Sequence, residues 1–301
     1  MDPVVPVYAP HAREMDDAVV VHLIHVRKTG GTALKHAFDA HPRTDRYRIL
    51  HHGHGTLLRD VPPGDKAIFF LRDPVARFVS GFYCRQRMGR PRYNSPWTVN
   101  ERAAFERFQA PNQLASALSS ADESERSCAQ SAMRAIQHLC SVFTWLESEA
   151  YLLSRLPDIF YIGFQETLDE DFEGLKLKLG LPPELRLSDD EVLSHRRPAH
   201  LDGHLDELAV ANLRAWYEAD RKIIDLCRWL SPEINGRSEV ARAQGSRRLE
   251  AGDSGQAGKQ GRAALGQQMT QDRQDRYPVQ HRRPVQLPGG CFVDPNDMPT
   301  R

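Results

Sequence analysis

Residues 18–26 read AVVVHLIHV, and RKTGGT at 27–32 and ALKHAFDA at 33–40 follow them directly. The first run is rich in β-branched residues and almost continuously apolar, which is typical of a strand buried on both faces of a parallel sheet. In the third run, apolar residues recur at helical spacing. The stretch therefore predicts a strand, a glycine-containing turn and a helix.

The same alternation continues along the chain. Further strands are predicted at residues 46–51, 66–71 and 158–164, and helices at 75–87, 101–118, 128–156, 168–179 and 205–230. Strands that alternate with helices indicate an α/β fold in which helices flank a parallel sheet.

The composition changes towards the carboxyl terminus. Residues 1–17 are proline-rich and form an N-terminal extension, and residues 18–235 carry all the predicted elements. In residues 236–301 Gly, Gln, Arg and Ser dominate, and Tyr277 and Phe292 are the only aromatic residues. Such a segment buries too little apolar surface to offset its ordering entropy. We therefore expect one domain at 18–235 and a disordered tail at 236–301.

Charge and apolar patterning restrict the class of protein. The 301 residues contain 40 Lys and Arg and 40 Asp and Glu, so the formal net charge is zero. This balance excludes a histone-like polycation, and we expect no nucleic-acid partner. No apolar run is long enough to span a membrane, and because the N-terminal residues Met-Asp-Pro lack a basic start and an apolar core, we expect no signal peptide. With five cysteines, an odd number, and no CxxC pair, the chain is expected to be cytoplasmic with reduced thiols.

The turn at residues 27–32 has the composition of an anion site. After a strand and before a helix, backbone N–H groups converge and the helix dipole adds to their attraction for an anion. Lys28 supplies a mobile charge, the threonines supply hydroxyl donors, and the glycines allow close backbone approach. Because Lys28 precedes the glycines, this is not a Walker A loop. The alternative is an ordinary strand-to-helix turn.

A second motif, RDPVARFVS at residues 72–80, follows the strong strand at 66–71. Ligands of open parallel sheets bind at the carboxyl ends of the strands. Arg72 would extend there and Ser80 lies about two helical turns further on, so both could contact one phosphate. The alternative is that Arg72 pairs with a carboxylate and that Ser80 is merely a small residue.

The two motifs, in this order and context, resemble the sulfotransferases that use 3′-phosphoadenosine 5′-phosphosulfate. The likeness is to the carbohydrate branch, and most of all to the uronosyl 2-O-sulfotransferases of heparan and dermatan sulfate. An HGH segment lies between the motifs at residues 52–54, and Tyr161 to Glu166 resembles a later strand-to-helix step of that branch. The resemblance covers residues 18–230. It implies a P-loop-like sheet and transfer of a sulfuryl group to a hydroxyl, with a carbohydrate as the acceptor.

The resemblance also implies roles for particular residues. His54 would be the catalytic base, His52 would help to orient the base or the acceptor, and Lys28 would stabilise charge on the leaving oxygen. Arg72 and Ser80 would hold the 3′-phosphate, which remains in the product adenosine 3′,5′-bisphosphate. The residues implied to hold the 5′-phosphosulfate are Arg27, Lys28, Thr29, Gly30, Gly31 and Thr32. A late basic loop closes over the nucleotide in this family, and Arg196 or Arg197 could reach the 3′-phosphate, unless that loop is simply solvated.

Other interpretations stay open. The histidines at 51, 52 and 54 could be structural or could bind a metal, although the sequence shows no third ligand at a recognisable spacing, and we expect no metal. A P-loop nucleotide kinase is the competing enzyme, and it needs a Walker A order and a magnesium-binding carboxylate. A nucleotide- or glycan-binding protein without activity would keep Arg72 and Ser80 but would not need Lys28 or His54.

Overall fold

The computed structural model describes residues 18–188, 190, 198 and 201–236. The expectations for the N-terminal extension, for Arg196 and Arg197, and for the tail beyond residue 236 lie outside the described residues. The described residues up to Asn235 belong to one compact unit.

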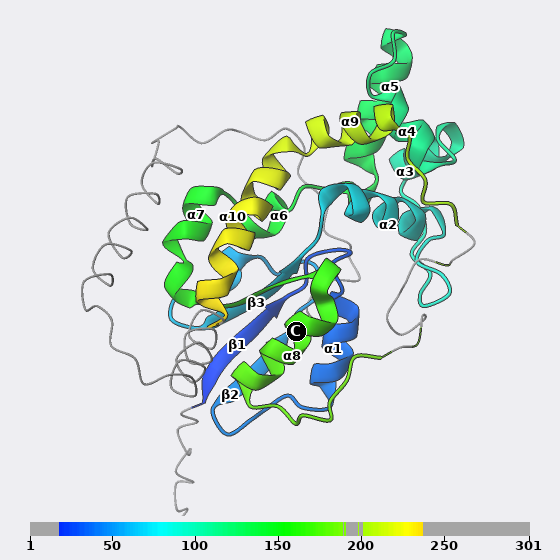
Figure 1. The fold of residues 1–301 in the computed structure, drawn as a ribbon. Helices are drawn as coiled ribbons and strands as arrows, with labels where there is room; N and C mark the ends of the chain where they lie inside the picture. The colour runs from blue at the N-terminus through cyan, green and yellow to red at the C-terminus, as the bar shows by residue number, and fades with distance from the viewer. Residues whose placement is uncertain (1–17, 189, 191–197, 199–200, 237–301) are drawn as a thin grey trace, which may run out of the picture. The chain divides into compact units, whose positions relative to one another are not determined.

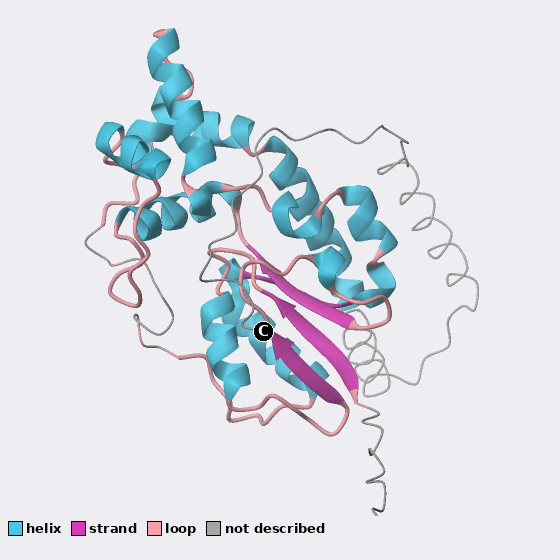
Figure 2. Cartoon of the chain, turned by 180° about the vertical axis from the view of Figure 1, so that it is seen from behind, coloured by secondary structure: helices cyan, strands magenta, loops and turns pink. Residues whose placement is uncertain are grey.

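Four parallel strands form the sheet in the described part of the chain, in the order β2-β1-β3-β4. The strands are β1 (Val19–Ile24), β2 (Tyr47–His51), β3 (Lys66–Leu71) and β4 (Ile159–Phe164). Every neighbouring pair is parallel, and Figure 2 shows the strands side by side with helices on both faces of the sheet. The predicted α/β class with a parallel sheet is confirmed.

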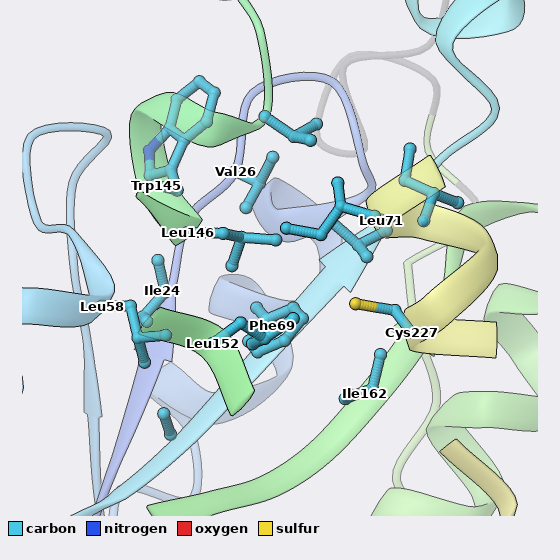
Figure 3. Packing of buried hydrophobic residues seen from close by; sticks show 14 of the residues in the cluster. Ile24, Val26, Leu58, Phe69, Leu71, Trp145, Leu146, Leu152, Ile162 and Cys227 are labelled. Carbon is cyan, nitrogen blue, oxygen red and sulfur yellow. The ribbon is translucent and has the colours of Figure 1, made fainter. Parts of the chain in front are cut away.

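Helices α1 (Gly31–Asp39) and α8 (Leu168–Leu179) cover one face of the sheet (Figure 1). Ile68 and Phe70 of β3 pack against them, whereas their strand neighbours point to the opposite face. There Phe69 and Leu71 pack in a cluster with Trp145 (Figure 3). Helices α6 (Phe143–Leu146), α7 (Glu149–Ser154) and α10 (Glu218–Ile234) contribute to that second face.

A group of helices forms a third apolar cluster, separate from the two faces of the sheet. Phe82 of one helix packs edge-on against Phe105 of another, with ring centroids 5.3 Å apart. The group comprises α2 (Pro74–Gln86), α3 (Val99–Arg107), α4 (Pro111–Ala117), α5 (Glu123–Ala135) and α9 (Glu207–Trp216), drawn at the top of Figure 1. Its position brings the segments between α2 and α6 towards the carboxyl ends of the strands.

A buried ion pair joins α2 to α3. The Arg85 guanidinium donates two hydrogen bonds of 2.7 Å to the Glu101 carboxylate, and both side chains are almost fully buried. Arg85 also donates to the backbone carbonyls of Ser95 and Pro96. The pair therefore holds the loop that connects the two helices.

Three predicted helices are broken in the structure. The helix predicted at 101–118 is divided into α3 and α4, because Pro111 cannot continue a helix and instead occupies the first turn of α4. The helix predicted at 128–156 is interrupted after Ala135, where buried side chains take over the backbone hydrogen bonds of residues 137–140. The helix predicted at 205–230 is divided at Tyr217, and its second part runs through Pro232 to Ile234.

Among the described residues, no helix has both the length and the apolar content needed to cross a lipid bilayer.

Candidate functional site

The strand order places a topological switch point between β1 and β3, because the chain leaves β1 towards β2 on one side and reaches β3 on the other. A cavity of about 520 Å³ lies there, within the range of small-molecule sites. Its lining comes from the segments after all four strands, from the α2–α6 region and from residues between α8 and α9: His25, Lys28, Gly30, Gly31, Thr32, Ala33, His54, Arg72, Ala76, Val79, Ser80, Arg92, Tyr93, His138, Gln165, Glu166, Leu168, Asp169, Leu187, Ser188 and Gly203.

The turn between β1 and α1 has the backbone of a close-fitting cradle. Lys28 has a φ of 66° and Gly30 a φ of 89°, so the backbone of both residues has a left-handed conformation. The Thr29 hydroxyl donates to the carbonyl of Val26 at 2.9 Å and closes the turn from below. A Cβ on Gly31 would lie 2.3 Å from the His25 ring, so a side chain there would collide with it. The glycines thus let the first amides of α1 face the cavity together with Lys28.

The two motifs meet in the structure. The Arg72 guanidinium donates a hydrogen bond of 3.3 Å to the backbone carbonyl of Lys28. The next residue, Asp73, caps α2 by accepting from Ala76, and its own N–H donates to the Glu166 carboxylate at 2.6 Å. The loops after β1, β3 and β4 are therefore bonded to one another. Because Glu166 follows β4 and Asp73 follows β3, this contact joins the ends of two strands.

Positive charge is concentrated around the cavity. Three basic side chains, Lys28, Arg72 and Arg92, line it, against two acidic ones, Glu166 and Asp169. Burial lowers the pKa of Lys28, and the neighbouring guanidinium groups of Arg87 and Arg72 lower it further. Like charges gathered in one partly desolvated place repel one another, and a bound polyanion would relieve that repulsion. The arrangement fits an anionic ligand.

His54 is held in one tautomer. Its Nδ1 lies 2.9 Å from the backbone carbonyl oxygen of His25, and because a carbonyl can only accept, Nδ1 carries the proton. The lone pair of the neutral ring is then on Nε2. The Trp145 indole N–H donates to the His54 carbonyl at 2.9 Å and fixes the backbone. The ring is therefore oriented as a proton acceptor.

The pKa of His54 is low in the ligand-free protein. Burial lowers it to about 3, with a further contribution from the positive charges of Arg27 and Lys28. The imidazole is thus neutral at physiological pH, as an acceptor must be. An anion bound beside Arg27 and Lys28 would oppose their effect and raise the pKa of His54.

His52 lies apart from the cavity. Its Nε2 is 2.9 Å from Nδ1 of His22, whose Nε2 is 3.0 Å from the Asp65 carboxylate. Burial lowers the pKa of His52 to about 4, and the neighbouring His22 adds to this effect. His52 thus belongs to a chain of hydrogen bonds that ends at Asp65, and its role towards His54 stays a prediction.

The structure brings most of the predicted site residues together. Arg27 is buried, with its guanidinium carbon 5.9 Å from the centre of the Trp145 ring, and Thr29 is used within the turn. Neither of them lines the cavity, and His52 does not line it either. The other predicted residues at the ends of β1, β2 and β3 do: Lys28, Gly30, Gly31, Thr32, His54, Arg72 and Ser80.

The lining residues that the sequence-based prediction gave no role include His25, Arg92, Tyr93 and His138. His25 could have been chosen from its place at the end of the first predicted strand, where alternation leaves its face undecided. Arg92, Tyr93 and His138 lie in the segment between α2 and α6, which has no recognisable motif. Their positions depend on the tertiary packing of α2, α3 and α5, and no local signal marks them.

The chain matches no protein-family model, and no curated protein sequence matches it. Within the described residues, no group of three or more His, Cys, Asp and Glu side chains is arranged to hold a metal ion. The function is therefore argued from the geometry of the cavity.

The free energy of unfolding should fall as the pH drops below about 6.5, the ordinary pKa of histidine. The pKa values of His54 and His52 are lowered to about 3 and about 4, and those of His25 and His138 also lie well below the ordinary value. The folded protein leaves these imidazoles neutral where the unfolded chain binds protons, so acid favours unfolding. Denaturant titrations between about pH 7.5 and about pH 5 measure this decline. A free energy of unfolding that is constant over this pH range would contradict the lowered pKa values. A decline in His54→Gln that is as steep as in the wild type would contradict the low pKa of His54.

Proposed function

We propose that the protein is a sulfotransferase that moves the sulfuryl group of 3′-phosphoadenosine 5′-phosphosulfate to a hydroxyl, with a carbohydrate as the acceptor. The observation that supports the proposal best is the meeting of the two anion motifs, through the Arg72 bond to Lys28, in one cavity with His54. The tautomer of His54 adds a base at the same place.

The nucleotide would occupy the ends of β1 and β3. The amides at the start of α1, with Lys28 and Thr32, suit the 5′-phosphosulfate, and this turn is the basis for proposing a P-loop-like fold. Arg72 and Ser80 suit the 3′-phosphate, because both line the cavity on the β3 side. The buried Arg27 contributes its charge through the protein rather than by lining the site.

The chemistry is an in-line displacement. The acceptor O–H bond breaks and its proton passes to Nε2 of His54, while the acceptor oxygen forms a bond to sulfur. The bond from sulfur to the bridging oxygen breaks, and its electron pair stays on the leaving phosphate, where Lys28 balances the growing charge. The negative donor also raises the pKa of His54 by opposing Arg27 and Lys28, which strengthens the base when the substrate is bound.

Calorimetry with three nucleotides tests the proposal. Adenosine 3′,5′-bisphosphate should bind far more tightly than ATP or ADP, because only the bisphosphate carries the 3′-phosphate that Arg72 and Ser80 are placed to bind. Magnesium-dependent ATP binding of comparable affinity would contradict the proposal and would favour a nucleotide kinase. Tight bisphosphate binding without any transfer to acceptors would indicate a nucleotide-binding protein.

Arg72→Ala is expected to weaken binding of the bisphosphate by about 10- to 100-fold, the size of one charge-assisted contact to phosphate. Arg102→Ala is the control, because Arg102 is an exposed residue of α3. Titration calorimetry measures both affinities, and circular dichroism checks that each variant is folded. An Arg72→Ala protein with the affinity of the wild type would remove Arg72 from the proposed site.

A further inference from the structure

His138 is a buried histidine of the cavity that neither motif contains. It lies in a short 3₁₀ turn, Gln137–Leu139, that follows α5. Only 6% of the residue is exposed, and it lines the cavity together with His54. A histidine that is buried at the wall of a reaction cavity is a candidate for contact with the substrate.

The backbone that carries His138 is held from two sides. The N–H of Gln137 donates to the buried Glu101 carboxylate at 3.2 Å. The Tyr217 hydroxyl donates to the carbonyl of Leu139 at 2.7 Å. These contacts come from α3 and from the junction of α9 and α10, so distant parts of the chain fix the turn that positions the ring.

Helix α2 approaches the same turn without an intervening side chain. A Cβ on Gly81 would lie 2.8 Å from the carbonyl oxygen of His138 and 3.1 Å from its Cβ. Gly81 directly follows Ser80, a residue of the cavity wall. The close approach thus places His138 next to the helix that carries one of the predicted phosphate contacts.

The imidazole of His138 has hydrogen-bonding capacity that the described part of the chain does not use. Its Nδ1 is buried and has no hydrogen-bond partner there. Burial and the charges of Lys28 and Arg27 keep the pKa of His138 well below its ordinary value, so the ring is neutral. A neutral imidazole has one N–H donor and one acceptor nitrogen. Buried polar groups left in this state call for an explanation.

The rings of His138 and His54 are neighbours, and both residues line the cavity. Their centroids are 6.3 Å apart and their planes meet at 64°. One oxygen atom with two hydrogen bonds of about 2.8 Å can join nitrogens that are about 5 Å apart. We propose that His138 donates a hydrogen bond to the acceptor hydroxyl oxygen while that hydroxyl gives its proton to His54. This inference rests on the proposed function of the site.

The proposed role of His138 is to stabilise the negative charge that develops on the acceptor oxygen. As the O–H proton moves to Nε2 of His54, negative charge develops on the oxygen, and the N–H of His138 stabilises it until the bond to sulfur forms. His138 gains and loses no proton, so the balance of the displacement is unchanged. Its contact is made to the acceptor and not to the nucleotide, which separates its effect from that of Arg72.

The test uses the full chain with His138→Phe and His138→Gln, and His36→Phe as an exposed histidine control. Partly desulfated heparan and dermatan oligosaccharides serve as acceptors with a saturating labelled donor. We expect His138→Phe to lower kcat/KM for the acceptor by about 30-fold or more, the scale of one donor to a developing oxyanion. His138→Gln keeps an N–H group and should retain several-fold more activity than His138→Phe. The affinity of both for adenosine 3′,5′-bisphosphate should stay within about 3-fold of the wild type, because the lost contact is not to the nucleotide.

The outcomes separate this inference from the proposed function. Wild-type kcat/KM in His138→Phe, or in His138→Gln if the first variant does not fold, would overturn the role of His138 and leave sulfuryl transfer standing. A loss of bisphosphate affinity as large as the loss of transfer would also overturn it, because His138 would then act on the nucleotide side. A wild-type protein that neither binds the bisphosphate nor transfers sulfate would remove the proposed function, and the role of His138 with it.

Discussion

His54→Ala should lower the rate of sulfuryl transfer by about 10²- to 10⁴-fold, the usual contribution of a positioned general base. The His54 ring is neutral, and its bond to the carbonyl of His25 leaves Nε2 as the only nitrogen able to accept a proton. Alanine removes that acceptor. Radiolabelled sulfate transfer to a fixed acceptor measures the rate, and calorimetry should show that the bisphosphate still binds.

Two further variants show whether the loss is chemical. His54→Gln keeps a polar amide in place of the imidazole but has no basic nitrogen to take the proton of the substrate hydroxyl, so we expect it to be nearly as inactive as His54→Ala. His36→Ala removes an exposed histidine of α1 and should leave the rate unchanged. Full activity in His54→Gln would show that His54 is a structural residue and that another group is the base.

Glu101→Gln is expected to lower the free energy of unfolding by about 3–5 kcal/mol, the cost of leaving one partner of a buried ion pair uncompensated. Glu101 is fully buried, and its carboxylate accepts from Arg85, from the backbone of Thr98 and from the backbone of Gln137. Glutamine has almost the same shape but no charge, and its amide nitrogen cannot accept. Denaturant unfolding followed by circular dichroism measures the loss.

The matched control for this prediction is Glu106→Gln, on the exposed side of the same helix. It should change the free energy of unfolding by no more than about 0.5 kcal/mol. Similar stabilities of the two variants would mean that the Arg85–Glu101 pair contributes little. Because Glu101 also holds the turn that carries His138, any folded Glu101→Gln protein should lose transfer activity as well.

The parallel sheet could be predicted because its strands carry their own signals. The apolar run that forms β1 and the KAIFFL run that forms β3 are recognisable without any neighbour, and the turn after each carries polar residues. The helices between α2 and α9 were harder, because the breaks at Pro111 and Tyr217 compete with continuous helical periodicity. Pro111 was visible in the sequence, but the buried hydroxyl contact that fixes Tyr217 depends on a residue 78 positions away.

The candidate site also contains residues that the sequence predicted and residues that it did not. Lys28 and Arg72 were predicted, because each follows a strand and the carboxyl ends of parallel strands share one edge. His54 was predicted only from the resemblance of the HGH segment to a known family. The detailed roles of Thr29 and His52 could not be predicted, because neighbouring residues in a turn point in different directions. Thr29 bonds within the turn and His52 bonds to His22, and neither lines the cavity. His138 reaches the cavity only through contacts with α2, α3 and the junction of α9 and α10. Such long-range placement leaves no pattern in the local sequence.

The most direct test of the central claim is transfer of labelled sulfate from 3′-phosphoadenosine 5′-phosphosulfate to a panel of oligosaccharides, phenols and aliphatic alcohols. We expect label in a carbohydrate acceptor with the wild-type protein, and loss of that label with both Lys28→Ala and His54→Ala. Label in no acceptor, from a folded protein that binds the donor no better than ATP, would contradict it.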